Sequence, residues 1–496
     1  MLTKLTSFAL WGLRCERITV EVCSVPGEST ISIVGLPDTA VQESKQRVRL
    51  ALRSSGYRLL TGRTMTVNLA PADIRKVGPR FDLPIALGLL LAQGLLSIPE
   101  EHLSTTAFLG ELSLDGILRH VSGVLPAAIA ARDAGFEALV VPYEDGPEAA
   151  LIPGLTVIAS RTLPELIAIL AGEHVPSPVS PPSMPHHSSA AVDFSDIRGQ
   201  YHAKRALEIA AAGDHHVLLS GPPGVGKTLL ARALCGILPP LTEEEAIEVT
   251  QIYSIANLLP HRTPLIRDRP FRAVHHTASA VSIVGGGQIP NPGEISLAHH
   301  GVLFLDELLE FPPHVLEVLR QPLEDHTITI ARAQGSATFP AEFTLVAAMN
   351  PPEYAASPQR ARRRISQPLL DRIDLTVDVP VVPIEDLQQK PSMGGEASDA
   401  VLARITAARE RQRSRFADLP LRTNAEMNVK HIDRLCVLDE LAQQLLAQAV
   451  SRLGLSARGY HRVIKVARTI ADLIGSDRIE CAHIAEALQY RQSARE

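Results

Sequence analysis

Apolar and polar residues alternate in several short stretches of the first 171 residues. Such alternation is typical of strands with one buried face, and it predicts strands at residues 17–22, 30–36, 64–70 and 138–141. A longer, helical spacing begins after Asp38 and stops at Gly56, and another helix is expected after Thr162. Strands interleaved with helices indicate an α/β unit over residues 1–171.

Residues 172–191 differ sharply in composition from their neighbours. They are rich in Pro, Ser and His, which cannot bury a core, so we expect an interdomain linker. A second α/β pattern covers residues 192–384, with apolar strand-like stretches at 217–220, 302–306, 343–349 and 375–379. Because helical segments separate them, this pattern predicts a parallel sheet with helices on both faces.

The chain after Pro380 is expected to be helical. Residues 385–428 are predicted to form a helical insertion, with a long Arg-rich helix after Ser398, and residues 429–496 a helical lid. The most apolar stretch, residues 83–96, is shorter than a membrane span and contains Gln93. We therefore read it as a buried helix and expect no membrane partner.

Composition limits the broad class of protein. The chain has 496 residues, a formal net charge of −6 and a sequence pI near 6.3, so any nucleic-acid contact must come from local patches. The five cysteines are odd in number and lack metal-ligand spacing. They argue for reduced thiols and against a Cys-based zinc site, and no signal-peptide pattern opens the chain, so we expect a cytoplasmic protein.

The stretch GPPGVGKT lies between a predicted strand and a predicted helix, which is the context that a phosphate-binding loop needs. Its glycines allow backbone N–H groups to surround phosphates, its lysine adds positive charge, and its threonine hydroxyl faces Mg²⁺. The expected nucleotide-binding residues are Gly221, Pro222, Pro223, Gly224, Val225, Gly226, Lys227 and Thr228.

Two further predicted strands end in polar residues. Asp306 and Glu307 follow the strand VLFL, so Asp306 is expected to hold Mg²⁺ with Thr228, and Glu307 to polarise an attacking water. Asn350 follows the strand FTLVAAM and could orient that water; the alternative is an asparagine that only caps its strand.

Taken in order, these motifs resemble AAA+ ATPases, in particular the magnesium-chelatase-like group that includes ComM, also called YifB. The resemblance rests on GPPGVGKTLLARAL, PNPGEISLAHHGVLFLDELLEF, LVAAMNP, PLLDRIDL and LSARGYHRVIKVARTIADL, and it covers almost the whole chain. It implies an amino-terminal Lon-protease-like (ribosomal S5 domain 2-like) α/β domain, a P-loop AAA+ α/β domain and a helical lid. It also implies ATP, Mg²⁺ and a homo-hexameric ring.

The resemblance assigns roles by position. Lys227 and Thr228 match Walker A, Asp306 and Glu307 match Walker B, and Asn350 matches sensor 1. Arg372 is the expected arginine finger, which reaches the ATP of a neighbouring subunit; the alternative is an ion pair with Asp371 or Asp374. Arg458 matches sensor 2, with Arg462 close enough to be the alternative.

Two segments are candidates for loops that project into the ring's pore: residues 271–296, which contain three glycines, and a hairpin over residues 326–343 with Arg332 near its tip. The alternative for both is a loop packed inside its own subunit. The paired histidines, such as His275 and His276, are expected to be structural, because adjacent side chains point apart on a strand or helix.

One departure from the family concerns the residues after Asn350. Family members usually carry cysteines there, whereas this chain has none, so any role of those cysteines is not carried over. A basic cluster remains, which could touch phosphates or be a solvated patch. Its members are Arg360, Arg362, Arg363 and Arg364.

Three functions compete at this point. The resemblance to ComM implies a motor that binds DNA, single-stranded or branched, and drives branch migration of recombination intermediates, in natural transformation or recombination. The alternative is a chelatase-type ATPase that remodels a protein partner without DNA. The Lon-like domain also suggests a protease, but Arg80 and Leu125 occupy the positions of the catalytic serine and lysine, so we expect no proteolysis. Lys76 and Arg80 could instead contact phosphates, or pair with Asp73 or Asp82.

Overall fold

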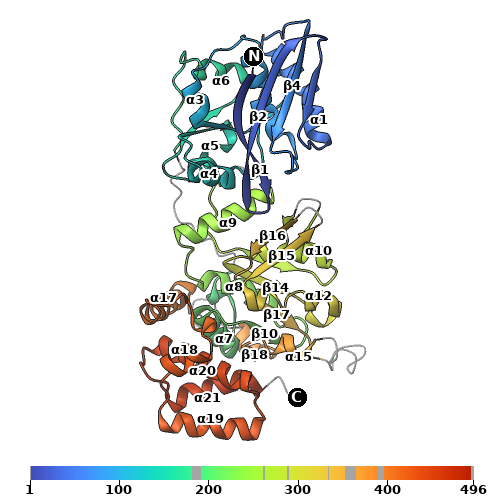
Figure 1. Ribbon diagram of the computed structural model, residues 1–496. Helices are drawn as coiled ribbons and strands as arrows, with labels where there is room; N and C mark the ends of the chain where they lie inside the picture. The colour runs from blue at the N-terminus through green and yellow to red at the C-terminus, as the bar shows by residue number, and fades with distance from the viewer. Residues whose placement is uncertain are drawn as a thin grey trace.

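The computed structural model describes residues 2–180, 192–260, 263–287, 290–332, 335–351, 365–388 and 396–492. An amino-terminal α/β unit stands at one end, a second α/β unit lies in the middle, and a group of helices forms the other end (Figure 1). Most of the predicted linker and the basic cluster at Arg360–Arg364 lie outside the described residues. No described helix is long and apolar enough to cross a bilayer.

The amino-terminal unit is built on a mixed seven-stranded sheet in the order β3-β4-β2-β1-β5-β8-β9. Its strands are β1 (Leu2–Trp11), β2 (Arg14–Pro26), β3 (Ile31–Val34), β4 (Arg63–Ala70), β5 (Thr106–Phe108), β8 (Ala138–Pro142) and β9 (Thr156–Ser160). Its helices are α1 (Thr39–Ser54), α2 (Asp82–Ala92), α3 (Glu100–Thr105), α4 (Val124–Asp133), α5 (Gly146–Ala149) and α6 (Leu163–Leu170). A short ladder, β6 (Glu111–Leu112) with β7 (Leu118–Arg119), completes it.

Local sequence signals explain several of these elements. The side chain of Asp38 accepts a hydrogen bond from the N–H of Val41 at 2.8 Å, which caps α1 where the sequence predicted its start. All eleven residues of α2 are buried, which confirms the predicted buried helix. The resemblance of this unit to a Lon-type fold stays a prediction.

The middle unit contains a five-stranded sheet in the order β11-β14-β17-β10-β18, and every neighbouring pair is parallel. Its strands are β10 (Val217–Ser220), β11 (Phe271–Val274), β14 (Gly301–Leu305), β17 (Phe343–Met349) and β18 (Leu375–Asp378). Alternate residues enter two separate cores: Val217 and Leu219 join one, and Leu218 joins the other. The predicted parallel sheet with two covered faces is therefore confirmed.

One of those two cores is closed by helices. They are α7 (Tyr201–Gly213), α8 (Lys227–Ile237), α17 (Ser398–Arg415), α18 (Val429–Leu435), α19 (Glu440–Leu453), α20 (Ala457–Ile474) and α21 (Cys481–Gln492). The Arg-rich helix predicted after Ser398 is α17, and it packs on α7, α8 and α20. The helices that follow it thus share their apolar core with the sheet.

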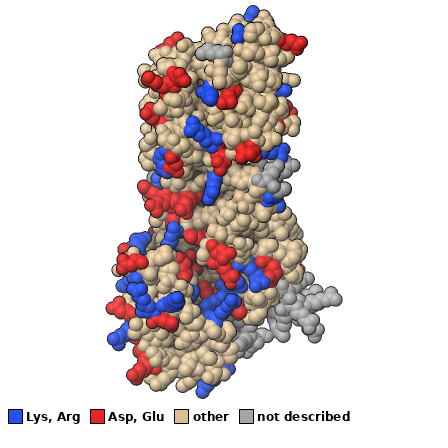
Figure 2. Space-filling view, viewed as in Figure 1, with Lys and Arg blue, Asp and Glu red and all other residues tan. Residues whose placement is uncertain are grey.

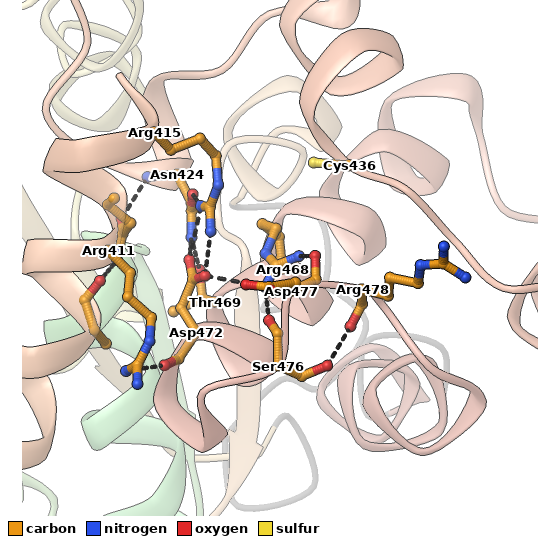
Figure 3. A network of polar contacts seen from close by, with 12 residues as sticks. Arg411, Arg415, Asn424, Cys436, Arg468, Thr469, Asp472, Ser476, Asp477 and Arg478 are labelled. Atoms are coloured by element: carbon orange, nitrogen blue, oxygen red, sulfur yellow. Dashed lines mark hydrogen bonds and ion pairs between the residues drawn. The ribbon is translucent and has the colours of Figure 1, made fainter. Parts of the chain in front are cut away.

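A buried polar network joins α17 to α20 (Figure 3). The carboxylate of Asp472 accepts hydrogen bonds from Arg415 at 2.9 Å, Asn424 at 2.8 Å and Arg468 at 3.0 Å. Asp472 and Arg468 are almost fully buried. Because two guanidinium groups depend on this one carboxylate, its charge is needed to keep them inside the protein.

The amino-terminal unit contacts the middle unit at helix α9 (Glu243–Ile255) and at the hairpin of β15 (Thr327–Arg332) and β16 (Gly335–Pro340). Ser254 donates to Glu148 at 2.5 Å, and Gln251 donates to the carbonyl of Leu13 at 3.0 Å. Gly12, with a φ of 59°, turns the β1–β2 hairpin so close to Ala337 that an added Cβ would lie 2.8 Å from it. The two units therefore interlock through backbone as well as side chains.

We predict that Asp472→Asn destabilises α20 locally by about 3–5 kcal/mol, because it leaves buried arginines without their counter-charge. Hydrogen exchange should show the protection of α20 amides falling by a factor of about 10² or more. Glu410→Gln, which removes an exposed partner of Arg413, is the matched control and should leave protection unchanged. Equal protection in Asp472→Asn and wild type would contradict the role of the network.

Candidate nucleotide site

Three strands of the middle sheet bring the predicted site residues to one edge. The loop Gly221–Thr228 follows β10, Asp306 follows β14, and Asn350 follows β17. These strands are parallel neighbours in the order β14-β17-β10, so their carboxyl ends meet at the same edge. In parallel sheets this edge is the usual place for a ligand.

Lys227 is the centre of the site. Its ammonium group donates to the carbonyls of Gly221 at 2.6 Å and Pro222 at 2.9 Å, and to the side-chain oxygen of Asn350 at 2.9 Å. Burial lowers the pKa of Lys227, and the charge of Asp306 opposes that shift. Gly224 and Gly226 have φ values of 83° and 91°, which lets the loop curl around the space in front of the lysine.

The residues predicted to hold Mg²⁺ are in contact. The hydroxyl of Thr228 lies 3.0 Å from a carboxylate oxygen of Asp306. Both groups offer the hard oxygen ligands that Mg²⁺ prefers, and Thr228 is exposed at the first turn of α8. Their chemistry and position therefore fit a magnesium ion bound together with a nucleotide.

Glu307 sits in a strained conformation beside a histidine that the sequence did not single out for it. Its φ is 53°, in the left-handed region, and its carboxylate lies 2.9 Å from Nδ1 of His276. The two atoms are within ion-pair distance, although they are not aligned as a hydrogen bond. His276 follows β11, the neighbour of β14, so the sheet itself places it against Glu307.

Residues 271–296, a candidate for a loop that projects into a ring's pore, are not one continuous loop. Phe271–Val274 lie in the sheet, and described residues beyond them form α10 (Ala280–Val284), the ladder β12–β13 (Gly285–Gly286 with Asn291–Pro292) and α11 (Glu294–Leu297). Projection into a pore stays a prediction. Arg332 of β15 donates to the carbonyl of Gly287 at 3.1 Å. The predicted hairpin is confirmed, and the two candidate loops pack against each other, close to the amino-terminal unit.

The arginines assigned to catalysis lie elsewhere. Arg372, Arg458 and Arg462 line one cavity of about 390 Å³, and no residue of the loop Gly221–Thr228 lines it. Arg372 is 9% exposed and pairs with Glu324, rather than with Asp371 or Asp374 as the sequence suggested for an ion pair. Arg462 lies 3.4 Å from Asp374 and also donates to the carbonyl of Ile373.

The paired histidines differ from the expectation that their rings point apart. The rings of His275 and His276 are 4.1 Å apart, and those of His299 and His300 are 3.8 Å apart. In the second pair, Nε2 of His299 and Nε2 of His300 both lie within hydrogen-bonding distance of the Glu248 carboxylate. However, Nδ1 of His299 accepts the N–H of Glu342, which keeps its proton on Nε2, where a metal would need a lone pair. A structural role for this cluster follows.

Comparisons with known proteins agree with this geometry. Family models match three parts of the chain: "Magnesium chelatase, subunit ChlI" over residues 193–387, "Subunit ChlI of Mg-chelatase" over residues 20–145 and "Magnesium chelatase, subunit ChlI C-terminal" over residues 395–491. Competence protein ComM of Haemophilus influenzae is 44% identical over 99% of this chain and 97% of its own length. The uncharacterized protein YifB of Escherichia coli is 42% identical over 97% of this chain and 96% of its own length.

The chain belongs to the ComM/YifB family of magnesium-chelatase-like proteins. A magnesium-chelatase 38 kDa subunit of Rhodobacter capsulatus is 31% identical, but over only 38% of this chain and 55% of its own length. Membership makes the chain an AAA+ ATPase of this family and generally implies dependence on ATP and Mg²⁺.

We predict that Asp306→Asn removes the magnesium dependence of nucleotide binding. In the wild type, chelating Mg²⁺ should weaken the binding of a fluorescent ATP analogue by about ten- to a hundredfold, because a charge-assisted contact of about 1.5–3 kcal/mol is lost. In Asp306→Asn, chelation should have little further effect. Asp133→Asn, an exposed carboxylate at the end of α4 in the amino-terminal unit, is the control. A wild-type magnesium response in Asp306→Asn would exclude Asp306 as a ligand.

Proposed function

We propose that this ComM/YifB-family protein hydrolyses ATP as a homo-hexameric ring and acts on DNA, single-stranded or branched, to promote branch migration of recombination intermediates. The observation that supports a ring is that the two groups of ATP-site residues lie apart within one chain. Residues for binding and cleaving ATP stand at the carboxyl edge of the five-stranded sheet. The arginines that would complete the reaction stand at its amino edge.

Strand direction sets that separation. Asp374 immediately precedes β18, and His215 and His216 precede β10, so the cavity lined by Arg372, Asp374 and His216 lies where these strands begin. The strands β10 and β17 have four and seven residues, so the two edges are roughly 13 to 23 Å apart at about 3.3 Å per residue. An arginine side chain cannot span that distance through a packed sheet, so these groups would serve a neighbouring copy.

At the carboxyl edge, each residue has a defined task in this proposal. Lys227 exchanges its carbonyl partners for phosphate oxygens, and Thr228 and Asp306 hold the metal, which neutralises charge on the phosphates. Glu307 polarises the attacking water, and Asn350, already bonded to Lys227, orients it beside the γ-phosphate. His276 restrains Glu307 until the nucleotide and the neighbouring copy are in place.

At the amino edge, the surroundings of the arginines separate their roles. Arg372 would exchange Glu324 for the γ-phosphate bound by the neighbouring copy. Between the two candidates for sensor 2, Arg462 is engaged with Asp374 and Ile373. Arg458 lines the same cavity, is exposed, and has no ion pair with a described residue. This difference favours Arg458 as sensor 2.

The name of one relative and the distribution of charge bear on the substrate of this proposal. The Haemophilus relative, named a competence protein, matches 99% of this chain, including the amino-terminal unit. On the face shown in Figure 2, basic and acidic side chains of the described residues are interspersed, so that face does not offer a broad cationic surface for DNA. Contact through the interior of a ring is consistent with this distribution of charge.

The second candidate is a chelatase-type ATPase that remodels a protein partner without DNA. It is favoured by the identity of 29–31% to magnesium-chelatase 38 kDa subunits. That match covers only 38% of this chain, whereas the match to the Haemophilus relative covers 99% of it.

We predict that Arg372→Ala lowers ATP turnover by about 10³ to 10⁵ while ATP binding is largely kept, because an arginine finger acts on the transition state. Lys227→Ala should lose binding as well as turnover. Mixing the two inactive variants should restore part of the turnover, since some interfaces then pair an intact P-loop with an intact arginine. Near-normal turnover by Arg372→Ala alone, or no recovery on mixing, would contradict a site shared between copies.

We predict that DNA stimulates ATP hydrolysis and that added salt reduces this stimulation steeply, since phosphate contacts release counter-ions. Strand exchange on a synthetic four-way or three-strand junction is the decisive assay. The control is Lys227→Ala, which changes only the P-loop and leaves the rest of the chain intact. If single-stranded, duplex and branched DNA all leave turnover unchanged, the chelatase-type candidate becomes the better account.

A further inference from the structure

A cavity of about 300 Å³ lies where the amino-terminal unit meets the AAA+ core. Its walls come from both: Gly78, Arg80, Glu111 and His120 on one side, and Asn257 and Asn291 on the other. This volume equals that of about ten water molecules in the liquid. The cavity is therefore large enough for a small polar ligand held by both units.

Arg80 is the unusual member of this wall. It is 6% exposed, and its Nη2 donates to the carbonyl of Ser122 at 2.8 Å, but its Nη1 has no hydrogen-bond partner among the described residues. No described carboxylate forms an ion pair with it. A buried charge without a counter-ion is costly, and an orphaned buried donor commonly marks a missing water or ion.

The carboxylates that the sequence offered to Arg80 are not its partners. Asp82 binds Arg47 at 2.9 Å and also contacts Ser44, so the predicted ion pair between Arg80 and Asp82 is wrong. No ion pair with Asp73 is present either, and Lys76, also buried, contacts the carbonyl of Pro71. If the predicted resemblance to a Lon-type fold holds, the position of that fold's nucleophile carries a cation that forms no ion pair with a described residue.

The other walls add donors and little negative charge. His120 lies between Asp145 at 2.5 Å and Asn257 at 2.9 Å, and its contact with Asp145 raises its pKa to about 9, so it is protonated at neutral pH. Because Oδ1 of Asn257 accepts from this imidazolium, the amide N–H₂ of Asn257 is left to donate elsewhere. Glu111 is the one lining carboxyl group among the described residues, and burial raises its pKa.

We infer that this cavity binds a small phosphate anion, inorganic phosphate or diphosphate, as the counter-ion of Arg80. Phosphate has more acceptor oxygens than a carboxylate, and in this proposal it accepts from Arg80 on the amino-terminal side and from the amides of Asn257 and Asn291 on the core side. Phosphate is also a product of ATP hydrolysis, and so is present wherever this family works. The anion fastens the amino-terminal unit onto α9 and β13.

The same wall connects the cavity to the ATP site. Asn291 belongs to β13, which leads through α11 into β14, the strand that Asp306 follows. A phosphate anion on Asn291 thus stiffens one end of the segment whose other end carries the Walker B residues. In this proposal, bound phosphate therefore affects both the docking of the amino-terminal unit and the segment that leads to Asp306.

The test uses the full chain with Lys227→Ala, which silences phosphate binding by the P-loop. Thermal unfolding and ³¹P NMR are followed while phosphate or diphosphate replaces chloride at constant ionic strength. We expect saturable stabilisation by phosphate. Adding Arg80→Met should raise the apparent Kd about tenfold or more, whereas Arg75→Met, an exposed arginine in the same loop, should not change it.

A second result separates this proposal from a purely structural role for Arg80. In phosphate-free buffer, Arg80→Met should unfold at the same or a higher temperature, because it removes an unpaired buried charge. If Arg80→Met does not fold, the phosphate titration of Lys227→Ala alone shows whether phosphate binds saturably. The same titration with Arg80→Lys added then shows whether Arg80 takes part. No saturable phosphate effect, equal phosphate affinity with Arg80→Met, or an Arg80-dependent response to single-stranded DNA but not to phosphate would each overturn the proposal.

Discussion

The common direction of the five strands in the AAA+ core is the constraint on which the rest of the structure depends. All side chains that follow a strand meet at one edge, and all that precede a strand meet at the other. Lys227, Asp306 and Asn350 are therefore neighbours although they are far apart in sequence. The same geometry keeps Arg372 and Arg458 away from them, in a cavity that no residue of the loop Gly221–Thr228 lines.

Buried polar contacts hold the helical end of the molecule against the amino edge of the sheet. His215 is fully buried between Asp374 at 3.2 Å and the hydroxyl of Thr469 at 2.8 Å. Burial alone would raise the pKa of Asp374, but the hydrogen bond from His215 and the charge of Arg462 hold it well below its usual range. Thr469 belongs to α20, the helix of Arg458 and Asp472, so the sheet, the arginine cavity and the network in Figure 3 form one connected structure.

Much of this arrangement follows from local sequence. Continuous apolar strands separated by helical segments predict a parallel sheet covered on both faces, and in such a sheet the P-loop, Asp306 and Asn350 must converge. Strand β11 was missed because only its last residue, Val274, is buried, so it shows no alternation. That omission hid His276, which contacts Glu307 only through the pairing of β11 with β14.

Other features depend on contacts that no local pattern encodes. Arg372 pairs with Glu324, in the short helix α13 (Pro322–Asp325), 48 positions earlier in the chain. The cavity beside Arg80 exists only because two folded units dock together. In each case, side chains meet through the packing of distant elements. Helix caps and buried helices, by contrast, were predicted because their causes lie within a few residues, as at Asp38.

The central claim is that each ATP site is completed across two copies of the chain. The most direct measurement is a cryo-EM structure of the full chain assembled with Mg²⁺ and a non-hydrolysable ATP analogue. The account predicts a closed ring in which Arg372 and Arg458 of one copy lie against the phosphates bound by Lys227 of the next. A nucleotide contacted by Arg458 of its own copy, or a nucleotide-bound monomer with a complete site, would contradict it.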